Sequence, residues 1–205
     1  MPMEKKLTRA QQKALRPLQI LDAAFEEFVK QGYSATRLED VAERVGVTKG
    51  TIYVYFETKE KLFEAMIRHI SGPLKTVLES ADTLDGHATD RLRRFLELLY
   101  DQIVDNRTMR ELIRFVIAEG AKFPDLVDRN HGEFIAPIIE KIQSLIEEGV
   151  AAGEFRRPST EAADVTMGPM LAMIVIRLIY EDRQPLDQHG FREEHIRMIL
   201  SGLTR

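Results

Sequence analysis

Hydrophobic residues recur at the spacing of an amphipathic helix along nearly the whole chain, and no segment alternates convincingly like a β-strand. The first such stretch covers residues 17–30, and Gly32 directly after it is expected to end the helix. Its apolar positions are Leu18, Leu21, Ala24, Phe25 and Phe28. The pattern as a whole predicts an all-α protein of about nine helices.

Two short helices follow, and each is preceded by a threonine that can cap it. Thr36 and Glu39 have the spacing of a capping box, in which each side chain accepts from a backbone amide. Gly46 can supply the turn after this second helix, because glycine adopts a positive φ without strain. Thr48 then caps a third helix, which is too short to be stable alone. This order predicts a helix-turn-helix.

The remaining pattern predicts longer helices. A fourth helix begins after Thr58, and its apolar positions continue past Pro73, so it is expected to connect two domains to about residue 82. Pro137 is expected to kink one of the later helices. Those later helices are placed near 88–105, 107–121, 125–152, 160–182 and 190–203. The predicted parts are a basic arm at 1–16, a helix-turn-helix domain at 17–68 and a ligand-binding and dimerisation domain at 83–205.

The third helix presents a face suited to the major groove of DNA. Ile52 and Phe56 define its buried side at 100° per residue. No carboxylate occurs between Val45 and Phe56, so the opposite side would not repel phosphates. Lys59 adds a cation beside the N-terminus of the fourth helix. The remaining residues of this face and its margins are Lys49, Gly50, Thr51, Tyr53, Val54 and Tyr55.

Several of these residues also have a purely structural interpretation. Thr48 caps a helix whether or not it touches DNA. Tyr55 can equally belong to the core, because it lies at the margin of the buried side. Arg37 and Arg44 can be solvated surface charges or phosphate ligands. The individual residues are therefore weaker indicators than the order of the capped helices.

Charge and composition narrow the class of protein. Residues 1–75 contain 13 Lys+Arg and 10 Asp+Glu, whereas residues 76–205 contain 16 and 23, so a basic front precedes an acidic rear. The absence of cysteine excludes disulfides, thiolate metal sites and cysteine nucleophiles. The most apolar stretch, 165–176, is shorter than the roughly 18 residues of a membrane span. A cytoplasmic protein with no membrane partner is expected.

No catalytic chemistry is apparent. The histidines lack the i, i+4 spacing of a metal site on a helix, no glycine-rich phosphate loop follows a strand, and no serine lies in a nucleophile elbow. We therefore expect no catalytic residues, no metal and no cofactor, and an enzyme is the less favoured alternative. The histidines are His69, His87, His131, His189 and His195.

The N-terminal quarter resembles the signature of TetR-family transcriptional regulators over about residues 17–68. The segments that carry the resemblance are Gly32-Tyr33 through Thr36, Asp40-Val41-Ala42, residues 45–53, Tyr55-Phe56 and residues 59–63. The resemblance implies a homodimeric repressor that binds a double-stranded operator through Thr36 or Arg37 and through Thr48, Lys49, Gly50, Thr51, Tyr53, Tyr55 and Lys59. Val54 stands where the family often has histidine or another polar residue, and it can contact a thymine methyl group instead.

The last two helices are the candidates for dimerisation. Residues 165–180 are apolar almost all round, so this helix must be covered on two sides, by its own core and by a partner. The resemblance implies a four-helix interface, with two reading helices about one DNA turn, roughly 34–36 Å, apart on a near-palindromic operator. The candidate interface residues are Val165, Leu171, Ile174, Val175, Leu178, Ile179, Ile196, Ile199, Leu200 and Leu203.

A pocket for a small, largely apolar effector is implied by the same resemblance. Its candidate lining is Phe95, Leu99, Phe115, Phe123, Phe134, Ile138, Met167, Met170 and Met173, each of which can also be ordinary core. Residues 119–128 resemble the C-terminal domain of a subgroup linked to efflux and stress control. The expected mechanism is a population shift in which the effector favours a state that no longer fits the operator. A ligand-independent DNA-binding protein and an activator stay open as alternatives.

Overall fold

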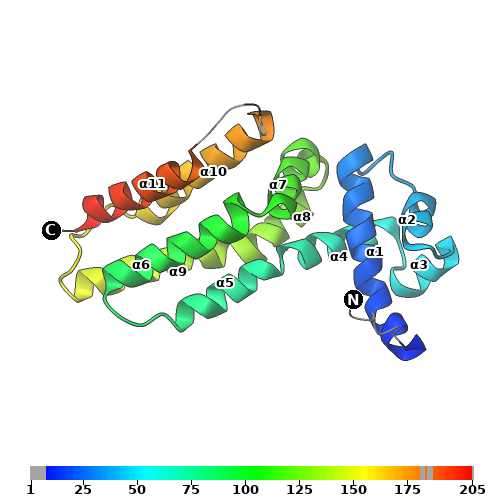
Figure 1. Ribbon diagram of the computed structural model, residues 1–205, viewed down its shortest axis with the longest axis horizontal. Coiled ribbons are helices and arrows are strands. Elements are labelled where there is room, and N and C mark those ends of the chain that lie inside the picture. The colour runs from blue at the N-terminus through cyan, green and yellow to red at the C-terminus, as the bar shows by residue number, and fades with distance from the viewer. Residues whose placement is uncertain (1–7, 181–182, 184–186, 205) are drawn as a thin grey trace, which may run out of the picture.

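The computed structural model describes residues 8–180, 183 and 187–204, and their regular secondary structure is helical apart from one isolated β-bridge between Phe155 and Thr204 (Figure 1). The prediction of an all-α fold is confirmed. The α-helices are α1 Arg9–Gln31, α2 Leu38–Val45, α3 Lys49–Tyr55, α4 Lys59–Ser71, α5 Pro73–Asp82, α6 Ala88–Leu99, α7 Arg107–Glu119, α8 Pro124–Asn130, α9 Ala136–Ala151, α10 Ala162–Tyr180 and α11 Gln188–Leu203.

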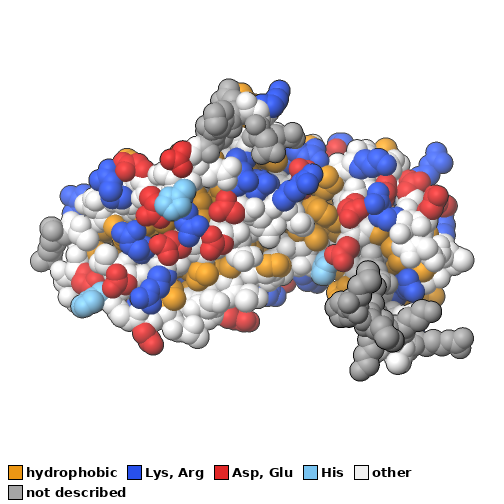
Figure 2. All heavy atoms as spheres, viewed as in Figure 1, with side chains coloured by type: hydrophobic (Ala, Val, Ile, Leu, Met, Phe, Trp, Pro, Cys, Tyr) orange, Lys and Arg blue, Asp and Glu red, His pale blue; other side chains and the backbone are white. Residues whose placement is uncertain are grey.

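Two lobes are visible in Figure 1. Helices α1 to α4 form a small head, and the later helices form an elongated body in which α10 and α11 lie along one side. On the face drawn in Figure 2, acidic and basic side chains are interspersed over the body, and hydrophobic side chains are visible near the junction with the head. Helix α4 joins the lobes, because it packs on α1 in the head and on α7 and α8 in the body.

The first helix begins earlier than the sequence pattern predicts. Thr8 caps α1, since its hydroxyl accepts from the amide of Gln11 at 3.3 Å and the Gln11 side chain accepts from the amide of Thr8 at 2.9 Å. Residues 9–16, assigned to an arm by sequence, are therefore the first turns of α1, and Pro17 lies inside the helix. The predicted arm residues Lys5 and Lys6 lie outside the described residues.

The predicted capping box at Thr36 is wrong. Thr36 is only 2% exposed, and its hydroxyl donates to the carbonyl oxygens of Glu27 and Gly32, at 3.0 and 2.8 Å, near the end of α1. Helix α2 begins one residue later, with the Asp40 carboxylate accepting from the amide of Arg37 at 3.1 Å. A buried hydroxyl needs a partner, and the nearby α1 carbonyls meet that need.

The predicted caps at Thr48 and Thr58 and the predicted glycine turns at Gly32 and Gly46 are confirmed. The hydroxyls of Thr48 and Thr58 accept from amides in the first turns of α3 and α4. Gly32 and Gly46 follow α1 and α2 with φ of 80° and 72°, values that other residues rarely adopt.

Two predicted helices are each divided by a proline. The fourth helix ends at Ser71, and α5 begins at Pro73, which has no amide hydrogen for a continuous helix. The predicted helix over 125–152 consists of α8, a π-helical turn at His131–Ile135 and α9. Pro137 is the second residue of α9, which follows that turn, so the irregularity lies close to where the sequence predicts a kink. These divisions explain why the described residues contain eleven α-helices rather than about nine.

Residues 165–176 alone are too short for a membrane span, but the whole of α10 is long and apolar enough for one by length and composition. Core helices of soluble proteins pass the same test, and α10 packs on α9 and α7. The guanidinium of Arg177 on this helix contacts the carbonyl of Val104 and the carboxylate of Asp105, both at 2.8 Å. These contacts favour a helix that belongs to the body.

Candidate DNA-binding interface and effector site

Helix α3 presents the face that the sequence predicts. Ile52 is fully buried and anchors the helix in the head, whereas Val54 on the opposite side is 78% exposed and Tyr53 is 45% exposed. Thr48, Lys49 and Gly50 are exposed, and Thr51 is half-buried. Tyr55 is also half-buried and packs against the core, which supports the structural interpretation of this residue.

A carboxylate from the neighbouring helix lies beside this face. Lys49 Nζ is 2.8 Å from Glu39 Oε1 and 5.7 Å from the centre of the Tyr53 ring. The hydrogen bond to Glu39 raises the pKa of Lys49, which keeps the ammonium charged. Glu39 lies outside residues 45–56, and only the packing of α2 on α3 brings its carboxylate beside this face, so the local sequence pattern does not reveal it.

The two arginines that the sequence left open have different positions. Arg37 is exposed at the start of α2 and is free to contact a phosphate. Arg44 instead binds Glu26 and Glu27 of α1, with Nε donating to Glu27 at 2.7 Å. Burial by itself would raise the pKa of Glu27, but the bonds from Arg44 and Gln31 lower it overall. Arg44 therefore fastens α2 to α1.

Lys59 at the start of α4 is held against aromatic rings of the head. Its ammonium lies 4.5 Å from the centre of the Tyr33 ring and 6.0 Å from that of Phe28, and it donates to the carbonyl of Ser34 at 3.4 Å. Burial lowers the pKa of Lys59, and the charge of Glu60 opposes this. Thr36, in contrast, is too buried to contact DNA in this arrangement and leaves the predicted set.

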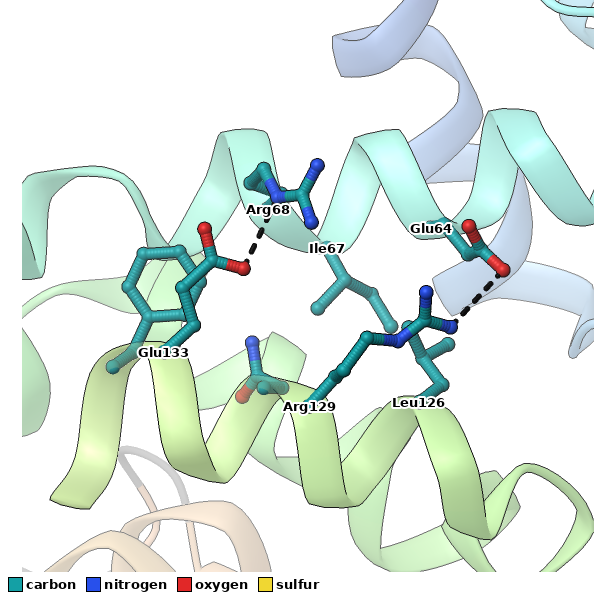
Figure 3. A pocket seen from close by; sticks show the side chains of 8 residues that line it. Glu64, Ile67, Arg68, Leu126, Arg129 and Glu133 are labelled. Carbon is teal, nitrogen blue, oxygen red and sulfur yellow. Dashed lines mark hydrogen bonds and ion pairs between the residues drawn. The ribbon is translucent and has the colours of Figure 1, made fainter.

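Two adjoining hollows lie where α4 of the head meets α7 and α8 of the body. Figure 3 shows the first, which is bridged by ion pairs from Arg68 to Glu133 at 3.1 Å and from Arg129 to Glu64 at 3.2 Å. The second has almost entirely apolar walls and encloses only about 10 Å³, roughly the room of a single water molecule. Residues that line the second hollow are Phe63, Ile67, Phe115, Val116, Glu119, Gly120, Phe123, Leu126 and Val127, and Ile67 and Leu126 line both.

Most residues of the predicted pocket do not line these hollows. Phe115 and Phe123 line the apolar hollow, and Phe134 lines its neighbour. The others belong to the core of the body or, for Met167, pack against it, and they are Phe95, Leu99, Ile138, Met167, Met170 and Met173. The sequence missed Phe63, Ile67 and Leu126, because only the tertiary fold brings the fourth helix against residues 124–130.

The α10–α11 side of the body has a clear division between covered and uncovered residues. Exposed apolar residues of the predicted interface are Val165, Leu171, Val175 and Ile179, and Leu178 and Ile199 are half-buried. Four predicted interface residues are instead buried in the chain's own core, and they are Ile174, Ile196, Leu200 and Leu203. Ile196, Leu200 and Leu203 face inward because α11 packs on α6, whereas Ile174 faces inward from α10, which packs on α9. Met198, which is 61% exposed on α11, was not predicted.

The head and body both match known families. Residues 20–66 match the model for bacterial regulatory proteins of the tetR family, and residues 90–200 match the C-terminal domain of AefR-like transcriptional repressors. A helix-turn-helix head on this body defines a DNA-binding transcriptional regulator. Because the second match spans more than half of the chain, the chain belongs to the TetR family.

Individual proteins agree with this assignment. The HTH-type transcriptional regulator YvkB of Bacillus subtilis is 25% identical over 191 residues, which is 90% of this chain and 95% of YvkB. A TetR-family regulator structure from Mesorhizobium loti has a TM-score of 0.72 at 19% identity, covering 97% of this chain and all of that one. FadR from Bacillus subtilis, solved with stearoyl-CoA, has a TM-score of 0.70 at 18% identity, covering 90% and 98%. These similar structures share the fold.

Proposed function

We propose that this protein is a cytoplasmic homodimeric repressor that binds a near-palindromic operator and is released by a small, largely apolar effector. The observation that carries the proposal is the pairing of an exposed reading face on α3 with an uncovered apolar face on α10. The first suits the major groove of DNA, and the second suits another copy of the same chain. One reading helix covers only half of a palindrome, so the two features belong together.

The dimer is supported by the spacing of the exposed residues on α10. Leu171, Val175 and Ile179 recur every four residues and therefore line one face of the helix. Small residues, Gly168 and Ala172, are also exposed on α10 and would let a second helix approach closely. A two-fold axis that runs along the length of the body beside this face would place the heads of two copies at the same end, each with its own α3.

The effector is proposed to enter the apolar hollow between α4, α7 and α8. Phe63, Phe115 and Phe123 provide aromatic walls, and the hollow adjoins the helix that connects the head to the body. FadR of Bacillus subtilis, which shares the fold, has been solved with a ligand that carries a long acyl chain. A bound effector would release DNA only if it binds the non-operator state more tightly than the operator state.

The direct experiment is selection of bound duplexes from a randomised pool, followed by titration at several salt concentrations. We expect enrichment of an inverted repeat whose half-sites are about 10–10.5 base pairs apart. On that duplex, Lys49→Ala should reduce the slope of log affinity against log salt by roughly one unit. Arg94→Ala on α6 of the body is the matched control and should leave the slope unchanged. Failure to enrich any sequence would refute the proposal.

A further inference from the structure

An aromatic cluster runs from the head into the body without interruption. Tyr33, in the turn after α1, stacks on Phe28 with ring centres 5.5 Å apart and lies 4.8 Å from Phe63 of α4. Its other neighbour is Phe123, directly before α8, whose ring meets it edge-on at 4.6 Å and 72°. Phe63 and Phe123 are both walls of the apolar hollow. Tyr33 therefore touches two walls of the proposed effector site.

The same tyrosine also touches a residue of the proposed DNA-binding set. The ammonium of Lys59 lies 4.5 Å from the centre of the Tyr33 ring, and the Tyr33 hydroxyl donates to Glu60 Oε1 at 2.8 Å. Burial raises the pKa of Tyr33, and the bond to Glu60 raises it further, so the hydroxyl stays protonated as a donor. The face of the Tyr33 ring thus contacts Lys59, and the Tyr33 hydroxyl contacts Glu60. Both partners belong to the first turn of α4.

We propose that Tyr33 is the positioning residue that holds Lys59 for its phosphate contact, and that Phe123 of the body sets the position of Tyr33. This inference rests on the proposed function and deepens it, because it names the residues through which the hollow acts on the DNA-binding face. Lys59 lies over the face of the Tyr33 ring, and the Phe123 ring meets the same ring edge-on. A shift of Phe123 therefore reaches Lys59 through one side chain, that of Tyr33.

The size of the hollow explains why a ligand would cause that shift. A hollow that encloses only about 10 Å³ does not hold a bulky apolar molecule, so Phe63 or Phe123 must move to admit one. Both rings contact Tyr33, which is only 9% exposed. Because Tyr33 is packed against these two rings, its own ring has to move when either of them moves. The ring would then carry Lys59 away from the position that suits the operator.

A double-mutant cycle on the selected operator duplex tests the first step. Tyr33→Leu removes the ring and should weaken operator binding roughly 3- to 10-fold, the usual range for loss of a cation–π contact. Tyr33→Phe keeps the ring and should bind within about twofold of the parent. In the Lys59→Ala background, Tyr33→Leu should cause no further loss. If Tyr33 has only a core role, Tyr33→Leu should instead cause the same loss of operator affinity in both backgrounds. Thermal unfolding of each variant identifies any that fails to fold.

The second step is tested from the body. Phe123→Leu should weaken operator binding about two- to threefold in the parent and have no effect once Tyr33 is Leu. Phe191→Leu, at another half-buried ring of the body on α11, should change neither background. The inference is overturned if the losses of operator affinity from the Phe123 and Tyr33 substitutions, or from the Tyr33 and Lys59 substitutions, simply add. In that case, operator binding by the parent still leaves the proposed function intact. If the parent selects no operator, both proposals are overturned.

Discussion

Helices α3 and α10 both expose large hydrophobic side chains, yet the surroundings of those side chains differ. On α3, Val54 is more exposed than any other large hydrophobic residue described here, and the other exposed side chains of this helix and its cap, Thr48, Lys49 and Tyr53, carry hydroxyls and a charge. On α10, Leu171 is 52% exposed, and the exposed residues one turn either side of it are apolar or small. Exposure alone therefore does not identify a partner.

The neighbouring chemistry distinguishes the two partners that we propose. A phosphate backbone needs donors and cations around an apolar contact, whereas a second copy of an apolar helix needs close packing with few charges. The head meets the first requirement with residues from three adjacent elements, α2, α3 and α4. The body meets the second with one helix. If the two faces act independently, a substitution on one face should leave the partner of the other unaffected.

Leu171→Glu should have the largest effect, because it places an unpaired carboxylate in the proposed dimer interface. The free energy of dimerisation should weaken by about 3–5 kcal/mol, a hundredfold or more. Sedimentation analysis over a range of concentrations measures this change. Val54→Glu is the control on the other face, and it should lose operator binding but remain dimeric. The comparison fails if both variants have the same oligomeric state as the parent.

Gly149→Ala tests whether the body depends on one close approach. A Cβ at Gly149 would lie 2.1 Å from Cδ2 of the Phe155 ring, which is fully buried beneath the end of α9. Overpacking of this kind should destabilise the protein by about 1–3 kcal/mol in urea unfolding. Gly132→Ala has open space around the added methyl group and should be neutral or slightly stabilising. Equal stability of the two variants would show that Phe155 shifts freely.

Thr48→Ala tests the corresponding feature of the head, a helix cap. The Thr48 hydroxyl accepts from the amide of Thr51 at 3.2 Å, and its loss should cost about 1 kcal/mol of head stability. Hydrogen exchange of amides in α3 measures the effect locally. Thr108→Ala, in the first turn of α7 but not at the cap, should cost only a few tenths. A global loss of protection across the body would contradict the idea that the cap acts only on the head.

The difference between contacts within a few residues and contacts between distant helices explains what the sequence could predict. Caps and glycine turns act over three or four residues, so Thr48, Thr58 and Gly46 were identified correctly from short segments. Thr36 was assigned wrongly because its partners are carbonyls of α1, up to nine residues earlier. The side of α11 that faces the core depends on α6, almost a hundred residues away in sequence, so periodicity could not separate Leu200 from Met198.

The stability of the body is also expected to depend on pH through a buried histidine. His195 is 5% exposed, and its Nδ1 lies 2.8 Å from the hydroxyl of Tyr100. Burial lowers the pKa of His195, although the Thr166 backbone partly opposes this. The unfolded chain therefore takes up the proton first as pH falls, so the stability from this group is complete above the ordinary histidine range and is lost below it.

Urea unfolding at pH 7.5 and 5.5 measures this loss, which cannot exceed about 1.4 kcal/mol per pH unit for one proton. The difference between the two pH values should be smaller in His195→Gln, because the substituted residue does not titrate. His131→Gln removes an exposed histidine and should keep the pH dependence of the parent. The lost stability comes from the contact between His195 of α11 and Tyr100 of the π-helical turn Tyr100–Val104, and both lie in the body. Head and body would then also differ in how their stability responds to pH. A parent whose stability is unchanged between the two pH values would show that His195 accepts a proton without leaving its site.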